Sequence, residues 1–141
     1  MDGNIDVLIN RLNDMGSILK KNMERPLLIA GEVVRTNIVK GIRGQKYNFK
    51  PLAPSTVEQK ARQKHSNLIL IAQGDYMGSF TVEQRDWDEV HIGTNHNQGR
   101  ALEFGYKPRN LPARPHVGPG LEESREKIKD ILEDGFKQVF E

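Results

Sequence analysis

Apolar residues recur at three- and four-residue steps over the first forty residues, and this spacing constrains the fold more than any other feature of the chain. Such steps place side chains on one face of an α-helix. The face consists of Ile5, Leu8, Leu12, Met15 and Leu19, and then of Leu27, Ala30, Val34, Ile38 and Ile42. Pro26 separates the two sets, and a proline inside a helix kinks or breaks it. The pattern therefore predicts either two helices or one bent helix, ending near Lys40.

The same spacing returns at the end of the chain. From Leu121 onward it predicts a second long helix. The apolar face of this helix is formed by Ile128, Ile131, Leu132, Phe136 and Val139.

Shorter elements are expected between these two helices. Ser55 followed by Glu58 three residues later resembles a capping box, which predicts a short helix from Thr56 to about Gln63. The alternating apolar and polar residues of 80–84 and 89–93 predict an antiparallel hairpin. Together these elements predict one α+β domain over residues 1–141. In it, long N-terminal and C-terminal helices pack on a small antiparallel or mixed β-sheet.

Irregular backbone is expected next to the hairpin. Asp75 is suited to cap one or two helical turns, and Arg100–Phe104 is suited to a short helical turn. Tyr106–Pro119 contains four prolines, which argues against both a helix and a central strand. We expect Phe104 to anchor this loop in the core.

The composition disfavours several kinds of chemistry. The chain has no cysteine, so disulfides, thiolate nucleophiles and cysteine zinc ligands are excluded. No two of its histidines have the His-x-x-x-His spacing of a helical metal site, and Ser79 does not lie in a Gly-x-Ser-x-Gly elbow. Its apolar runs are far shorter than the roughly 20 residues that cross a bilayer. We therefore expect no enzyme activity, no cofactor, no metal and no membrane partner.

Basic residues are concentrated between positions 35 and 64. They are Arg35, Lys40, Arg43, Lys46, Lys50, Lys60, Arg62 and Lys64. One interpretation is a surface that faces DNA or an acidic protein, such as the lumen of a ring. The other is an ordinary solvated surface balanced by acids elsewhere, and the net charge of only +2 favours it.

Four short pieces occur in a particular order in the middle of the chain. They are Phe49–Thr56, Leu70–Phe80, Val90–Asn95, and Ala101–Gly105 with Leu111–Gly118. This order resembles that of the virion-morphogenesis and tail-completion proteins of tailed bacteriophages. In that family a Trp-x-Pro-Leu-Ser-Pro-x-Thr element is followed by Leu-x-x-Thr-Gly-x-Leu-x-x-Ser, an Ile-Gly-Thr strand, (His/Val)-x-Phe-Gly and Pro-Ala-Arg-Pro-Phe-(Leu/Val)-Gly. The resemblance covers half of the chain.

The chain departs from the family pattern at several positions. Phe49 stands where the family often has Trp, Gln73 where Thr is usual, and Leu102 where some members have His. His116 replaces the usual Phe. These changes are compatible with packing roles and leave the subfamily open.

The resemblance implies a structural virion protein of a tailed phage or prophage, assembled in the cytoplasm of a bacterial host. It would be a tail-completion or neck subunit that joins the tail to the DNA-filled head. Its partners would be copies of itself in a ring, with a hexamer expected, the neighbouring neck and tail-tube proteins, and DNA passing through the lumen. No catalysis would be needed.

The candidate fixed points of this protein are Phe104, Gly105, Arg114 and Pro115. Arg114 can bind a carboxylate or backbone carbonyls with its planar guanidinium. Two roles remain open for it: bracing the loop of its own subunit through an acid such as Glu103, or binding the next subunit. The alternative function is a basic nucleic-acid-binding module. Its DNA-facing residues would be Arg35, Lys40, Arg43, Lys46, Lys60, Arg62 and Lys64.

Overall fold

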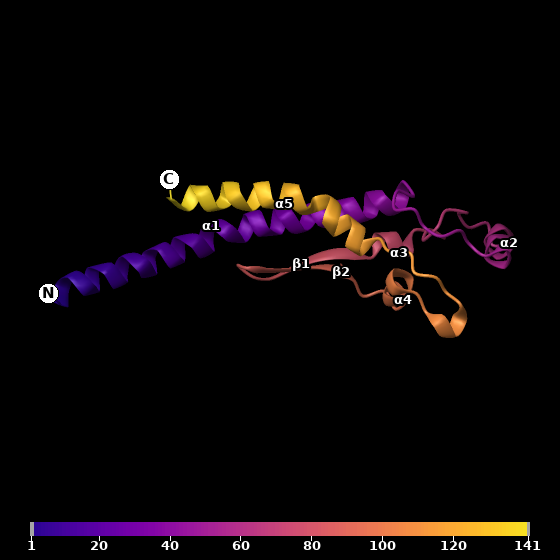
Figure 1. Cartoon of the computed structure of the whole chain (residues 1–141), viewed down its shortest axis with the longest axis horizontal. Helices are drawn as coiled ribbons and strands as arrows, with labels where there is room; N and C mark the ends of the chain where they lie inside the picture. Colours follow the sequence, from indigo (N-terminus) through magenta and orange to yellow (C-terminus); the bar gives the residue numbers. More distant parts are fainter. Residues whose placement is uncertain (1, 141) are drawn as a thin grey trace.

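The computed structural model describes residues 2–140 as an elongated molecule with three layers: helix α5, the second half of helix α1, and a β-hairpin (Figure 1). The elements in chain order are α1 (Asp2–Arg43), α2 (Pro54–Arg62), α3 (Asp75–Gly78), β1 (Phe80–Asp86), β2 (Glu89–Thr94), α4 (Gly99–Phe104), the 3-10 turn η1 (Lys107–Arg109) and α5 (Val117–Phe140). The two strands form one antiparallel sheet. The fold is α+β, with long helices at both ends of the chain, as the sequence predicts.

Helix α1 is continuous through Pro26, so of the two predicted alternatives the single helix is confirmed and the pair of helices is wrong. Proline lacks the N–H that would bond to the carbonyl one turn earlier, which weakens a helix at that point. Here α5 packs on the weak turn. A Cβ on Gly135 would lie 2.8 Å from the Pro26 Cγ, so the proline ring occupies the space that a side chain at 135 would need. This tertiary contact supports the helix where its own hydrogen bonding is interrupted.

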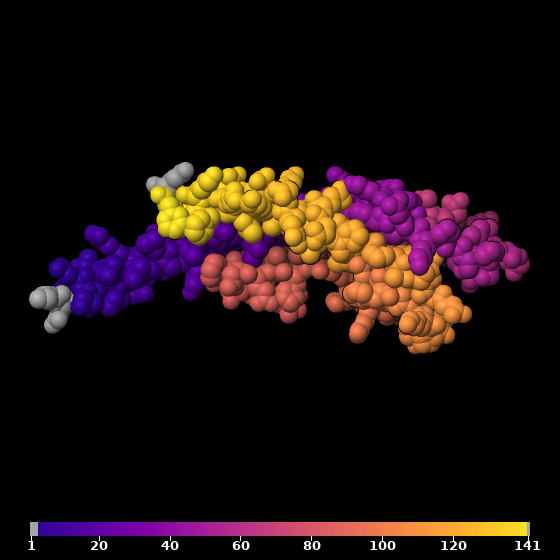
Figure 2. Space-filling model, viewed as in Figure 1, coloured from indigo at the N-terminus to yellow at the C-terminus, as the bar shows by residue number. Residues whose placement is uncertain are grey.

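Helix α5 runs antiparallel along α1 (Figure 1). Gly135 lies against Pro26, and Gly120 lies against Ile38, where a Cβ would come within 2.5 Å of the Ile38 Cγ1. At a rise of 1.5 Å per residue in both helices, the end of α5 therefore reaches only about residue 20 of α1. The turns of α1 before that point project beyond the rest of the molecule (Figure 2).

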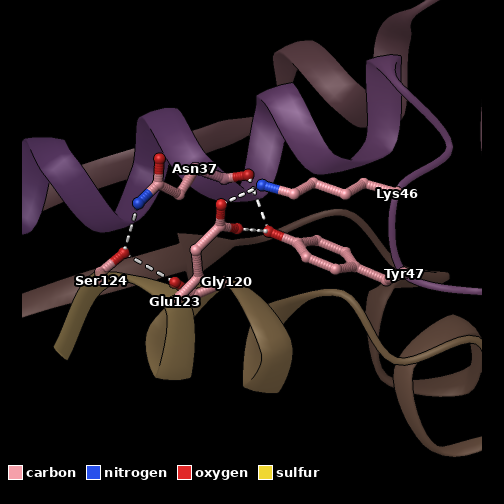
Figure 3. A network of polar contacts seen from close by, with 6 residues as sticks. All are labelled: Asn37, Lys46, Tyr47, Gly120, Glu123 and Ser124. Carbon is pink, nitrogen blue, oxygen red and sulfur yellow. Dashed lines mark hydrogen bonds and ion pairs between the residues drawn. The ribbon is translucent and has the colours of Figure 1, made fainter.

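A polar network holds the start of α5 against the end of α1 (Figure 3). Asn37 donates to the Ser124 hydroxyl at 2.8 Å, and Ser124 donates to the Gly120 carbonyl at 2.7 Å. The Tyr47 hydroxyl lies 2.8 Å from a carboxylate oxygen of Glu123, which also pairs with Lys46. Burial, with the hydrogen bond and charge of Glu123, raises the pKa of Tyr47. Ser124 is fully buried, so the network fixes the register of the two helices.

The core lies where the second half of α1 meets α3, β1 and the start of α5. Val34, Ile38 and Ile42 pack with Tyr76 of α3 and Phe80 of β1. The predicted hairpin is confirmed, with Val82 opposite Ile92 and an irregularity between Gln84 and Asp86. It approaches α1 at Gly31, where a Cβ would lie only 2.9 Å from the Val82 Cγ1.

Two helix starts differ from their predictions. Helix α2 begins at Pro54 after Ala53, and no side chain caps it, so the predicted capping box of Ser55 and Glu58 does not form. Proline is suited to the first helical position because its fixed φ matches the helix. Glu58 instead pairs with Arg62 one turn later. At α3 the N-cap is Gly74, with φ of 91°, and not Asp75.

The proline-rich segment is more helical than expected. Residues Lys107–Arg109 form η1, and α5 begins at Val117, before the predicted start at Leu121. Local patterning missed this start because the groups that stabilise it lie elsewhere in the chain, as described below. No helix among residues 2–140 is both long enough and apolar enough to cross a membrane.

Candidate functional site: a motif junction and an uncovered helix face

The four sequence pieces meet at one junction. The hydroxyl of Tyr76, in the second piece, lies 2.5 Å from Nε2 of His116, in the fourth piece. The hydroxyl of Ser79, in the second piece, lies 2.5 Å from the hydroxyl of Thr94, in the third piece. Arg114 of the fourth piece binds the first piece. The pieces are therefore linked in space as well as ordered in sequence.

Arg114 binds its own chain. Only 5% of the residue is exposed. Its Nε donates to the Lys50 carbonyl at 2.8 Å and its Nη2 to the Pro51 carbonyl at 2.9 Å. Burial lowers the pKa of Arg114. The guanidinium thus braces the loop of its own subunit, which is one of the two predicted roles, but it does so through the backbone carbonyls of residues 50–51 and not through an acid such as Glu103.

Glu103 has a different role, which sequence reasoning missed. Its carboxylate accepts the backbone N–H groups of His116 at 2.8 Å, Val117 at 3.0 Å and Gly118 at 3.1 Å. These are donors at the start of α5, which have no partner inside the helix. A carboxylate there also interacts favourably with the helix dipole. Glu103 therefore caps α5 from a distant position, and no local spacing in the sequence signals it.

The pKa of Glu103 reflects two opposing effects. Burial raises it, whereas the three backbone N–H donors and the charge of His116 lower it. The net result is a pKa below the ordinary value of 4.5.

His116 stands at the centre of the junction and is fully buried. Besides Tyr76, its ring contacts the Arg114 carbonyl at 2.7 Å and the Glu103 carboxylate at 3.1 Å, both through Nδ1. The rings of Phe49, Tyr76 and Phe80 surround it edge-on. The Tyr76 hydroxyl, the His116 imidazole and the Glu103 carboxylate form a row of polar contacts that joins three segments of the chain.

Phe104 does not anchor the loop in the core, because 75% of it is exposed. The next residue, Gly105, has φ of 80°, and a Cβ there would lie 2.9 Å from the Ala113 nitrogen. The chain turns sharply at this glycine and directs Phe104 outward. Pro115 is also exposed. An exposed phenylalanine is a candidate contact for another protein.

Four of the seven candidate DNA-facing residues make ion pairs or hydrogen bonds with other residues of their own chain. Lys46 pairs with Glu123, and Arg62 pairs with Glu58. The other two bind backbone carbonyls: Arg35 donates to Phe80 at 2.9 Å, and Lys60 to Leu68 at 2.7 Å and Ile71 at 3.0 Å. Lys40, Arg43 and Lys64 are exposed and make no ion pair with any residue of the described chain.

A cleft of about 880 Å³ lies beside the junction, between the segment around α2 and the loop at 109–114. The His65 ring in its wall bonds to Gln73, and the His96 ring accepts the backbone N–H of Gln98. Among residues 2–140, no three His, Asp or Glu side chains are placed to hold a metal ion.

The projecting part of α1 carries an apolar face, which we call the α1 stripe: Ile5, Leu8, Leu12, Met15 and Leu19. Leu19, at its inner end, is half-buried, and the other four are exposed. The first three are 58%, 57% and 58% exposed, and Met15 is 44% exposed. Ile9 and Ile18 beside the stripe are also exposed. The sequence indicates that this face is apolar, but only the structure shows that α5 ends before reaching it.

Fold and surface together define a small α+β protein with an exposed apolar helix face. No protein-family model and no solved structure matches the chain. It is similar to the uncharacterized protein MJ0331 of Methanocaldococcus jannaschii, with 25% identity over 109 residues, which cover 75% of this chain and 81% of that protein.

Proposed function

We propose that this chain is a structural subunit of a multi-protein assembly, specifically a tail-completion or neck subunit of a tailed phage or prophage. The observation that carries the assembly role is the α1 stripe. Soluble monomers seldom expose contiguous apolar patches of more than a few hundred Å², and larger ones mark interaction sites. A helix that extends beyond its own domain with such a face is suited to contact another subunit.

The phage assignment rests on the resemblance of the four ordered pieces. Their residues bond to one another at the junction of Arg114, Glu103 and His116. The resemblance therefore involves residues that fix the shape of the subunit, as expected when a family shares a scaffold. His116 is suited to the position where the family usually has phenylalanine, because its ring packs among aromatic rings and its nitrogens have hydrogen-bond partners.

In the proposed assembly, copies of the chain form a ring, with a hexamer expected, between neck and tail-tube proteins. A ring needs head-to-tail contacts whose rotation closes. The α1 stripe and the exposed side chain of Phe104 are two separate surfaces available for such contacts.

The experiment is complementation of a phage or prophage that lacks this gene. Wild-type protein should restore tailed particles and be detected in purified virions by mass spectrometry. Leu12→Glu should leave filled heads without tails, because it places a charge in the stripe. Asn13→Glu is the matched control, since Asn13 is exposed and outside the stripe. Absence of the wild-type protein from virions, with normal particles made without it, would reject the proposal.

A further inference from the structure

We infer that, before assembly, the α1 stripe of one copy packs antiparallel against the α1 stripe of a second copy. The protein would then be a two-fold dimer in solution. The inference takes the proposed role as an assembling subunit as its starting point. Beyond that role, it identifies a second copy of the chain as the partner that covers the stripe when the neighbouring virion proteins are absent.

The first argument is the spacing of the stripe. Ile5, Leu12 and Leu19 are seven residues apart, as are Leu8 and Met15, so the two sets alternate as the a and d positions of a heptad. A heptad seam is complementary to another helix with the same repeat, whose side chains fit between its own. The second copy of this chain supplies such a helix with the same exposed segment.

The second argument is continuity with a contact that already exists. Met23, one turn after Leu19, lies where α5 covers α1: a Cβ on Gly135 would come within 3.5 Å of its sulfur. Met23 also lines a shallow apolar hollow with Leu132 and Phe136. The seam between α1 and α5 therefore leads directly into the stripe. A helix from a second copy would extend this seam from the end of α5.

The third argument decides the orientation. When a and d residues of antiparallel helices alternate, Leu8 lies opposite Leu19 of the other copy. A parallel pair would bring the two α5 helices into the same space, because each already covers the seam beyond about residue 20.

A two-fold pair is closed, since each copy uses the same patch, so no ring can grow from it. The dimer is therefore a soluble form of the subunit in which the apolar face is covered. It must open when the neck partner binds the stripe.

Sedimentation equilibrium of the full-length protein tests the pairing. We expect a mass twice that of the 16.0 kDa chain at micromolar concentration. Leu12→Glu should raise the dissociation constant by about 100-fold or more, because it buries an unpaired charge in each copy. Asn13→Glu should leave it unchanged. Wild-type protein that is monomeric under these conditions, or a Leu12→Glu dimer as stable as wild type, would overturn the inference.

Disulfide trapping tests the orientation without interference, because the chain has no cysteine of its own. In the antiparallel pair a mixture of Leu8→Cys and Leu19→Cys proteins should cross-link. Neither variant should cross-link alone, since equivalent positions would lie about 16 Å apart along the axis. A disulfide needs Cα atoms within about 7 Å. Cross-linking by each variant alone, with none between the two, would mean a parallel pair and refute the proposed geometry.

The two proposals can fail separately. A protein found in virions but monomeric in solution would refute the pairing and leave the assembly role standing. A dimer with the predicted cross-links that is absent from virions would refute the phage assignment and leave the pairing standing.

Discussion

Replacing Glu103 by glutamine tests whether one distant carboxylate determines where α5 begins. In the wild-type protein one carboxylate oxygen accepts the N–H groups of His116 and Val117, and the other accepts that of Gly118. Glutamine keeps one acceptor oxygen but turns its NH₂ group toward the remaining N–H. The variant therefore loses at least one charge-assisted hydrogen bond and leaves one donor facing another.

The expected cost follows from these contacts. A hydrogen bond to a charged group contributes about 1.5–3 kcal/mol, and removing a helix cap costs about 0.5–2 kcal/mol. Because glutamine retains part of the arrangement, we expect Glu103→Gln to lower the free energy of unfolding by about 1–3 kcal/mol at pH 7.

The effect should depend on pH in a defined direction. The pKa of Glu103 lies below 4.5 in the folded protein, because the three N–H donors and His116 outweigh the effect of burial. The stability due to its ionised form is therefore present above about pH 4.5 and is lost as the pH falls through the folded pKa. Since a protonated carboxyl resembles an amide, the difference between wild type and Glu103→Gln should shrink at acid pH.

Urea unfolding followed by circular dichroism at pH 7 and at about pH 3.5 measures this difference. Glu126→Gln is the matched control, because Glu126 is an exposed residue of α5 and its side chain makes no hydrogen bond with any residue of the described chain. The reasoning would be refuted if Glu103→Gln matched wild type within about 0.5 kcal/mol at pH 7. It would also be refuted by an equal loss of stability at both pH values.

Three further predictions concern the brace, the helix contact and DNA. Arg114→Lys should lower the free energy of unfolding by about 2–4 kcal/mol, because one ammonium cannot replace the planar fork that binds two carbonyls; thermal unfolding would detect this loss. Gly120→Ala should lower the free energy of unfolding, measured in urea, by about 1–3 kcal/mol, because the new methyl group meets buried Ile38. Alanine has the higher helix propensity, so a stabilised variant would contradict this packing. Binding to duplex DNA can be measured by fluorescence anisotropy at several salt concentrations. Because only three candidate residues are unpaired, the slope of log Kobs against log salt should be no steeper than about −3. A steeper slope that is lost in the double variant Lys40→Gln, Arg43→Gln would favour the nucleic-acid alternative.

The sequence alone determined the elements that depend on local spacing. The three- and four-residue steps predicted both long helices, and the alternation around Val82 and Ile92 predicted the hairpin. These predictions hold because a helix or a hairpin places neighbouring residues on fixed faces, whatever surrounds it. The order of the four pieces was likewise visible without the structure.

Only the tertiary structure decided what those faces contact. Pro26 interrupts a local pattern, yet α1 continues because Gly135 lets α5 pack on it, more than a hundred residues later in the chain. Glu103 caps a helix that begins at Val117, and Arg114 binds carbonyls more than sixty residues earlier. The sequence shows that the α1 stripe is one apolar face, and the structure shows that most of it is exposed. Spacing shows that a face is apolar, but the length and register of the covering helix determine whether it is buried.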